Sequence, residues 1–293
     1  MNVPFLRDDA LAHGEVERIA PGVRRVLCNN PSAFTFRGTN TYLIGGGQSV
    51  AVLDPGPTDA EHLAAILRAT NGERISHILV SHTHRDHSPG ARALAEITGA
   101  ATYAHGPHAT PPNPGNEGGD HAFQPDHRLA DGEALEGADW QITALFTPGH
   151  CGNHLCFALD GTGILFSADH VMSWSTSVVS PPDGNMRDYM HSLARLRARE
   201  GQDRLYLPGH GPSLPEPMPF LDALSAHRMK REARIMAALR EHGPTTLEAL
   251  VGPVYGPLDP RLVGAAGRSM LAQLLMLQED GAAVFRDGLW QAG

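Results

Sequence analysis

The chain has 293 residues, of which 41% are hydrophobic and 19% charged, as in a globular protein with one large domain or one domain plus a small appendage. Its formal net charge of −9 disfavours binding of nucleic acid through a broad basic surface. No apolar run is as long as a membrane span and the first residues do not resemble a secretory signal, so we expect a cytoplasmic protein with no membrane partner. Cys28, Cys151 and Cys156 form no C-x-x-C pattern, which argues against a disulfide framework.

The first third of the chain alternates segments typical of strands and helices. The glycines at 45–47 favour a hairpin between two of the strands. Thr58 and Asp59 are expected to cap one helix, and Ser88 and Pro89 are typical of the N-cap and first position of a second. Over this part of the chain we predict strands at 23–27, 41–44, 50–53 and 75–80 and helices at 60–71 and 89–97.

The middle of the chain repeats this pattern after a long loop. The loop over 105–127 is rich in Pro, Gly and His, and we interpret its histidines as solvated rather than as a further metal site. Strands beside helices, twice over, predict an α/β fold of two similar halves whose sheets pack together. The predicted strands are 140–146, 154–159, 163–167 and 205–207, with a helix at 186–199.

The C-terminal part of the chain has a different pattern. Helices are predicted at 221–242, 245–251 and 260–277, followed by a β-hairpin over 282–290 around Asp287-Gly288. Three helices and a hairpin are typical of a winged-helix-like domain, so we divide the chain into domains 1–216 and 217–293. Eight basic residues balance eight acidic ones in the second domain. Packing or homodimerisation, through the apolar helix 262–277, is therefore at least as well supported as nucleic-acid binding.

The most informative motif is the turn that follows the apolar run 78–80. His82, His84 and His87 lie there within a few residues of Asp86. A tight turn between a strand and a helix can direct several side chains to one point. Neutral imidazole and carboxylate are the ligands that suit zinc and similar divalent ions. The turn therefore predicts a metal site.

Further ligand candidates follow later strands in the same local setting. His150, Asp169 and His210 each come at the end of a β-run and are flanked by small residues that permit sharp turns. Seven ligands suffice for two metals when one carboxylate bridges them. We assign Asp169 as the bridge. The first site is predicted to hold His82, His84 and His150, and the second Asp86, His87 and His210.

Residues 18–211 resemble the metallo-β-lactamase-fold hydrolases, on the H-x-H-x-D-H motif and the three later ligand positions in family order. The resemblance implies an αββα sandwich with the metals at one edge of the two sheets. Asp54, in Leu53-Asp54-Pro55-Gly56, matches a family position that supports the metal site from behind; a carboxylate that caps its own turn is the alternative. His154 and His170 are expected to support the site or the structure rather than to bind metal.

The segments 38–44 and 178–184 and the C-terminal domain are similar to the branch called β-lactamase-like protein 2. Members of that branch include endoribonucleases that act on single-stranded RNA. The chain departs from the branch after His150, where Cys151-Gly152-Asn153 replaces Thr-Pro-Gly. This difference alters the wall of the pocket and weakens any transfer of substrate.

The expected chemistry is hydrolysis by two divalent ions, with zinc as the first choice and manganese or iron as alternatives. Such ions lower the pKa of water, and Asp86 is our candidate to orient the nucleophile and move its proton. We expect a small-molecule ester, thioester or lactone as substrate, ahead of phosphodiester cleavage in single-stranded RNA. Asp169 argues against a β-lactamase, because β-lactamases of this fold lack that carboxylate.

Other activities of the family match less well. Lactonases that act on acyl-homoserine lactones carry a tyrosine where this chain has Met172, and the glutathione contacts of glyoxalase II have no counterpart in the C-terminal domain. A regulator that binds DNA without catalysis would be expected to have lost ligands, yet all seven are present.

Overall fold

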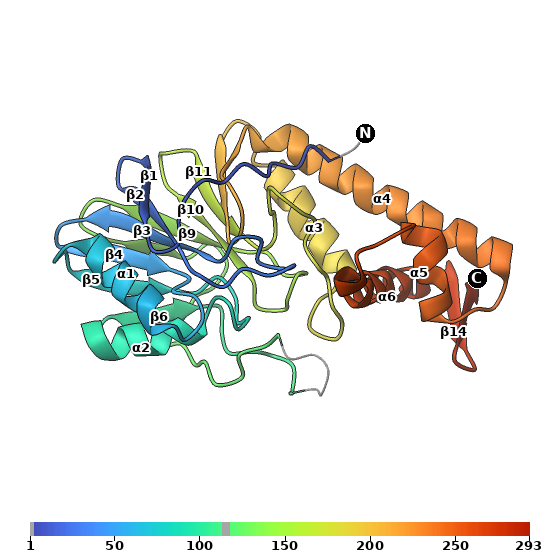
Figure 1. The fold of residues 1–293 in the computed structure, drawn as a ribbon. Helices are drawn as coiled ribbons and strands as arrows, with labels where there is room; N and C mark the ends of the chain where they lie inside the picture. The colour runs from blue at the N-terminus through green and yellow to red at the C-terminus, as the bar shows by residue number, and fades with distance from the viewer. Residues whose placement is uncertain (1–2, 113–117) are drawn as a thin grey trace.

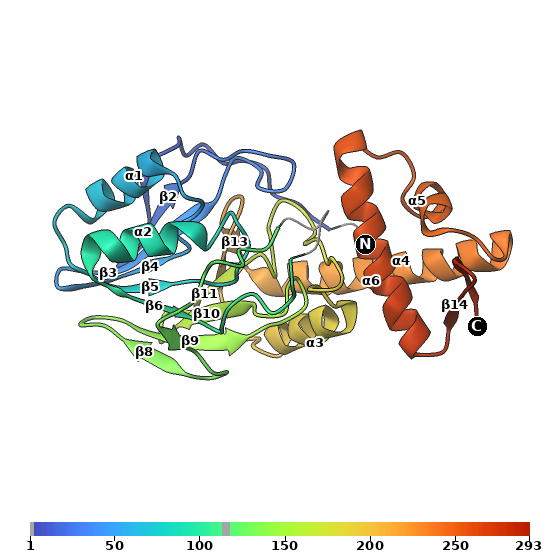
Figure 2. The ribbon, with the colours of Figure 1, turned by 90° about the horizontal axis from the view of Figure 1, so that it is seen from below.

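The computed structural model describes residues 3–112 and 118–293 and has the predicted αββα architecture. Two mixed β-sheets pack face to face, and helices cover the outer face of each (Figures 1 and 2). The C-terminal helices and a small hairpin lie together at one end of this sandwich. Among the described residues, no helix combines the length and the apolar character needed to cross a membrane.

The first sheet has seven strands in sequence order, antiparallel up to β4 and parallel from β4 to β7. Two helices, α1 (Ala60–Thr70) and α2 (Pro89–Thr98), bury Ile66 and Leu94 against its outer face. The strands are β1 (Val16–Ala20), β2 (Val23–Leu27), β3 (Asn40–Gly46), β4 (Ser49–Leu53), β5 (Ile75–Leu79), β6 (Ala101–Ala104) and β7 (His127–Arg128).

The second sheet has six strands in the order β13-β12-β11-β10-β9-β8. Its outer face is covered by α3 (Met186–Arg197) and by the first part of α4 (Pro217–His242), which bury Leu193 and Leu221. The strands are β8 (Ala134–Glu136), β9 (Gln141–Phe146), β10 (Leu155–Leu159), β11 (Ile164–Ala168), β12 (Leu205–Pro208) and β13 (Leu214–Pro215).

The two halves repeat one plan, as the sequence predicts. In each, antiparallel strands lead into a parallel strand pair joined by a crossover helix: β4-α1-β5 in the first half and β11-α3-β12 in the second. Apolar side chains from both inner faces form the core between the sheets, among them Tyr42, Ile44, Phe157 and Phe166. Because parallel strands of one sheet end on the same edge, this plan brings the turns after β5, β11 and β12 together.

Both predicted helix starts are confirmed, but only one of them has a capping hydrogen bond from a side chain. Asp59 caps α1, since its carboxylate accepts hydrogen bonds from the N–H groups of Glu61 and His62. Ser88 occupies the N-cap position of α2 and Pro89 begins the helix, as predicted, but the Ser88 side chain makes no capping hydrogen bond. Its hydroxyl instead donates to Asp120 Oδ2 at 2.7 Å, so Ser88 ties the histidine turn to the loop before β7.

The C-terminal domain consists of the second part of α4, α5 (Leu247–Tyr255), a short 3-10 turn (Pro260–Leu262), α6 (Val263–Glu279) and the hairpin β14 (Ala283–Arg286) and β15 (Leu289–Ala292). Asp287 and Gly288 both have positive φ, 52° and 81°, as a two-residue hairpin turn requires. The apolar residues of α6 that suggested a dimer, such as Met270 and Leu274, are buried in this domain's own core. Because α4 contributes to both cores, the boundary at 216/217 stays a prediction.

Candidate metal centre

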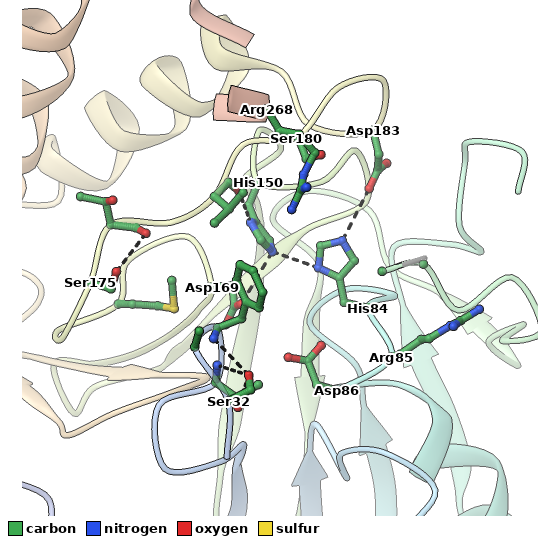
Figure 3. Close-up of a pocket in the computed structure, with 18 of the residues that line it drawn as sticks. Ser32, His84, Arg85, Asp86, His150, Asp169, Ser175, Ser180, Asp183 and Arg268 are labelled. Atoms are coloured by element: carbon green, nitrogen blue, oxygen red, sulfur yellow. Dashed lines mark hydrogen bonds and ion pairs between the residues drawn. The ribbon is translucent and has the colours of Figure 1, made fainter. Parts of the chain in front are cut away.

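All seven predicted ligands meet at one edge of the sandwich. Four come from the turn between β5 and α2, and three follow β9, β11 and β12. Their ring nitrogens and carboxylate oxygens form groups whose members lie within 4.8 Å of one another. Figure 3 shows four of the seven side chains converging: His84, Asp86, His150 and Asp169.

The first group contains His82, His84 and His150. His84 Nδ1 lies 3.0 Å from His82 Nε2 and 3.0 Å from His150 Nε2. The outer nitrogens of two of these rings have clear partners: His150 Nδ1 donates to the carbonyl of Val178 at 2.6 Å, and His82 Nδ1 lies 2.9 Å from Ser81 Oγ. Because these outer nitrogens carry the protons, the inner ones present lone pairs to a common point.

The second group contains Asp86, His87 and His210. His87 Nε2 and His210 Nε2 face each other at 3.3 Å, and Asp86 Oδ2 lies 3.2 Å from His210 Nε2. His87 Nδ1 donates to Asp54 Oδ2 at 2.9 Å, while His210 Nδ1 donates to the carbonyl of Gly38 at 3.1 Å. Once the inner nitrogens have lost their protons, the two rings turn lone pairs toward each other, an arrangement that a cation between them would stabilise.

Asp169 lies between the two groups. Its Oδ2 is 3.6 Å from His150 Nε2 in the first group and 3.5 Å from His210 Nε2 in the second. Its Oδ1 is buried and has no hydrogen-bond partner among the described residues. A buried carboxylate oxygen without a donor is costly unless it binds a cation, so the donor set fits a pair of divalent ions.

Charge distributes differently over the two groups. Burial and the neighbouring imidazoles lower the pKa of His84 to about 3, and they also lower that of His82. At the second group, burial opposes protonation, but Asp169 and Asp86 outweigh it and raise the pKa of His210 to about 9. The same carboxylates raise the pKa of His87. A metal entering the second group therefore has to displace protons.

Asp54 lies behind the histidine turn. Its buried carboxylate accepts hydrogen bonds from Ser81 N at 2.7 Å, from Ser81 Oγ at 2.6 Å and from His87 Nδ1. These bonds reach the ligand turn rather than Asp54's own turn. His154 is buried beside His82, with ring centroids 5.1 Å apart, and its Nδ1 contacts Thr147 Oγ1 at 3.0 Å. His154 belongs to none of the groups of ligand atoms found among the described residues.

Two supporting residues carried no role in the sequence analysis. Asn40 of β3 donates through Nδ2 to the carbonyls of Pro208 and Gly211, at 2.9 and 2.8 Å, and so holds both sides of the His210 turn. Arg25 of β2 donates to the Gly211 carbonyl at 3.1 Å. Both are buried polar residues on strands. A polar side chain within a predicted strand was the sequence signal that could have identified them.

The interpretation of the loop histidines is wrong for His108. Its side chain is only 4% exposed, and its Nδ1 lies 2.8 Å from Thr83 Oγ1. Asp183 Oδ2 is 3.9 Å from His108 Nε2 and 3.9 Å from His84 Nε2. His127, in contrast, is exposed as expected. The proximity of Asp183 and His108 to His84 joins segments far apart in the sequence, which no local motif reveals.

A cavity of about 490 Å³ opens onto the two groups. Its wall combines His84, Asp86, His150 and Asp169 with largely apolar side chains from three other segments. These side chains are Phe34, Met172, Trp174, Val178 and Leu262. Asp86, with 28% of its side chain exposed, is open to this space. The cavity therefore presents the metal groups to a ligand with substantial apolar surface.

Comparison with protein families gives two matches, which lie in different parts of the chain. The family described as the Metallo-beta-lactamase superfamily matches residues 34–210. The Beta-lactamase associated winged helix domain matches residues 246–290. The first match includes β3 to β12 of the sandwich, and the second runs from the start of α5 into β15.

Similar proteins extend over most of the chain. A Caenorhabditis elegans protein named Beta-lactamase-like protein 2 homolog is 31% identical over 93% of this chain and 90% of its own length. An Aspergillus chevalieri protein named Atrochrysone carboxyl ACP thioesterase is 29% identical over 89% of this chain and 82% of its own. A solved metallo-β-lactamase family protein from Thermus thermophilus superposes with a TM-score of 0.78, at 24% identity, over 94% of this chain and all of that one.

Proposed function

This chain belongs to the metallo-β-lactamase superfamily and is a metal-dependent hydrolase, and we propose that it uses two divalent ions to hydrolyse acyl thioesters. The observation that carries the binuclear site is the position of Asp169 between two groups of ring nitrogens, with its own Oδ1 lacking a donor among the described residues. We assign His82, His84 and His150 to one ion, Asp86, His87 and His210 to the other, and Asp169 to both. Zinc suits imidazole-rich sites, and manganese or iron accepts the carboxylates.

When bound, a pair of divalent ions lowers the pKa of water from about 15.7 to near 7 and places positive charge where the acyl oxygen becomes negative. The protein's own groups position the reactants. Asp86 is exposed to the cavity and held 3.2 Å from His210 Nε2, so its free oxygen can accept a hydrogen bond from the attacking water and orient it. The apolar wall excludes water from the acyl chain.

The thioester is favoured over the other acyl substrates by the named relatives and by the cavity. The Aspergillus chevalieri relative carries the name Atrochrysone carboxyl ACP thioesterase. The cavity wall that includes Phe34, Met172 and Val178 is suited to an acyl group. Single-stranded RNA cleavage stays a prediction, as do homodimerisation and a cytoplasmic location.

A substrate screen of the metal-loaded protein tests the activity. It compares an acyl thioester of N-acetylcysteamine with a lactone, nitrophenyl acetate, a bis-nitrophenyl phosphodiester and a single-stranded RNA. We expect thioester turnover well above that of the lactone and the phosphodiesters. Turnover of only the phosphodiester and the RNA would reject the proposal.

Asp169→Ala tests the shared ligand. Elemental analysis of the wild-type protein, loaded with zinc and desalted, is expected to find two ions per chain. The variant loses its bond to both groups, so we expect it to retain at most one ion and to lose nearly all hydrolysis. Asp160→Ala, which replaces an exposed aspartate just after β10, is the matched control and is expected to keep both ions. Full metal content in Asp169→Ala would exclude the bridging role.

A further inference from the structure

Arg268 is a cation of the C-terminal domain that enters the catalytic cavity. It lies on α6, is partly buried and contributes to the wall of the cavity. Figure 3 shows its side chain directed toward His150 and the metal groups. Its guanidinium makes no hydrogen bond or ion pair with any residue in the described ranges 3–112 and 118–293. In this respect it differs from Arg187 of α3, which pairs with Glu279 and Asp280.

The position of Arg268 is fixed relative to the metal groups. The neighbouring Ser269 accepts a hydrogen bond from the backbone N–H of Val179 at 3.2 Å through its Oγ, and the carbonyl of Val178 accepts the Nδ1 proton of His150. One short segment thus holds both a predicted metal ligand and α6. Arg187 adds a second tie, because its guanidinium also donates to the carbonyl of Met276 near the end of α6.

The carboxylates in the described part of the cavity wall contact groups other than Arg268. Asp86 and Asp169 face the ring nitrogens of the metal groups. Asp183 accepts a hydrogen bond from the N–H of Gly152 at 3.1 Å and lies 3.9 Å from His84 and His108. None of the three forms an ion pair with Arg268 among the described contacts. Among the described residues, nothing occupies the planar fork of donors of this partly buried guanidinium, and that fork is suited to a carboxylate or phosphate.

We propose that Arg268 binds an anionic group of the substrate, so that the C-terminal domain selects anionic thioesters for the catalytic site. This inference rests on the proposed thioesterase function. The anion is an oxyanion that Arg268 can engage with two parallel hydrogen bonds: a carboxylate on the acyl group or a phosphate on the thiol part. The remainder of the acyl group then lies against the apolar wall, with its carbonyl at the metal groups.

The first experiment measures binding without turnover. Thioether analogues of succinyl-N-acetylcysteamine, in which CH₂ replaces the thioester carbonyl, are titrated calorimetrically into the metal-loaded protein as the free carboxylate and as its methyl ester. If the anion lies on the acyl side, we expect the carboxylate to bind about 10- to 100-fold more tightly than the ester, the range for one charge-assisted contact. Arg268→Gln is expected to abolish that difference, and Arg268→Lys to restore part of it.

The second experiment separates the two sources of the anion. Hydrolysis is compared for butyryl-N-acetylcysteamine, succinyl-N-acetylcysteamine and butyryl-CoA, which are respectively uncharged, anionic on the acyl side and anionic on the thiol side. Arg268→Gln is expected to raise KM for one of the two anionic substrates and to leave the neutral substrate unchanged. The affected substrate identifies the anion.

The matched control is Arg85→Gln, because Arg85 carries the same charge at the cavity but is exposed and points away from the metal groups (Figure 3). Equal losses in both variants would show a general charge effect and reject the specific site. Equal binding of carboxylate and ester by the wild type, together with an unchanged KM for butyryl-CoA in Arg268→Gln, would also reject it, with thioesterase activity retained. Arg268-dependent binding of the carboxylate without hydrolysis of any thioester would instead retain the anion site and reject the thioesterase function.

Discussion

Asp54 shows how much of the metal centre depends on one residue that does not face it. Its carboxylate receives two hydrogen bonds from Ser81 and one from His87, and its backbone has a φ of 51°. The proton that it accepts from His87 Nδ1 determines which nitrogen of that ring carries a lone pair. A residue behind the site thus sets the chemical form of a predicted ligand.

Asp54→Asn keeps the shape of the side chain and is expected to weaken metal binding at the second group. Either orientation of the amide places an NH₂ group against an N–H or O–H donor of Ser81 or His87. We expect the metal affinity of that group to fall about 10- to 100-fold, measured by competition with a chelator. Asp59→Asn, at the start of α1, retains a good capping residue and serves as the control with unchanged affinity. Equal affinities in the two variants would contradict the role of Asp54.

At the scale of elements, the site depends on how closely three turns approach. Gly209 follows β12 and lies against the turn after β11 and the turn before α2. A Cβ atom at this position would come within 2.5 Å of Asp169 Oδ1 and 2.7 Å of His87 Cε1. The backbone of Gly209 does not have positive φ, so the requirement for glycine is one of space.

Gly209→Ala is therefore expected to separate Asp169 from His87 without changing any ligand. We expect the loss of about one of the two ions and a destabilisation of about 1–3 kcal/mol from overpacking, measured by elemental analysis and by urea unfolding. Gly252→Ala in α5 is the control, because no described atom lies within 4 Å of the Cβ position there. Two ions retained in Gly209→Ala would show that the turns can move apart freely.

The sequence predicted the parts of this architecture that depend on local patterns. Four ligands within one turn, and three more at the ends of apolar runs, suffice to place the seven side chains near one edge. The short strands β1 and β6 were missed, since neither the exposed Val16–Ala20 nor the four-residue Ala101–Ala104 has a strong alternating pattern. Arg268 was missed because its position in the cavity depends on how α6 packs, which no motif near residue 268 encodes.

At the scale of the whole molecule, α4 links the two domains as one continuous helix. Its first part buries Phe220 and Leu224 against the second sheet, and its second part buries Ile235 and Leu239 in the C-terminal core. Two histidines outside the metal groups lie on helices: His62 on α1 is buried, and His227 on α4 is partly buried. Burial lowers the pKa of His62 to about 4. For His227, burial and the positive charge of the neighbouring Arg228 lower the pKa to about 4.

These two histidines predict a loss of stability in acid. Each has a lower pKa in the folded chain than the usual value of about 6.5, so unfolding takes up protons. Their contribution is complete above pH 6.5 and is lost as the pH falls toward 4. Urea unfolding in the presence of chelator, which removes the effect of metal loss, should show this decline. His62→Gln is expected to flatten it, and the exposed His127→Gln to leave it unchanged; identical slopes in all three proteins would contradict the assignment.

The tie at Val178 and Val179 has a consequence for attempts to recombine proteins of this architecture. When the C-terminal domain is exchanged between two such hydrolases, it brings its own α6. The recipient protein supplies the backbone N–H of Val179, which bonds to α6, and the carbonyl of Val178, which orients His150. A poorly matched graft would therefore disturb catalysis and selectivity at once. A chimera that keeps its activity should therefore receive the loop between β11 and α3 together with the C-terminal domain, both from the same parent protein.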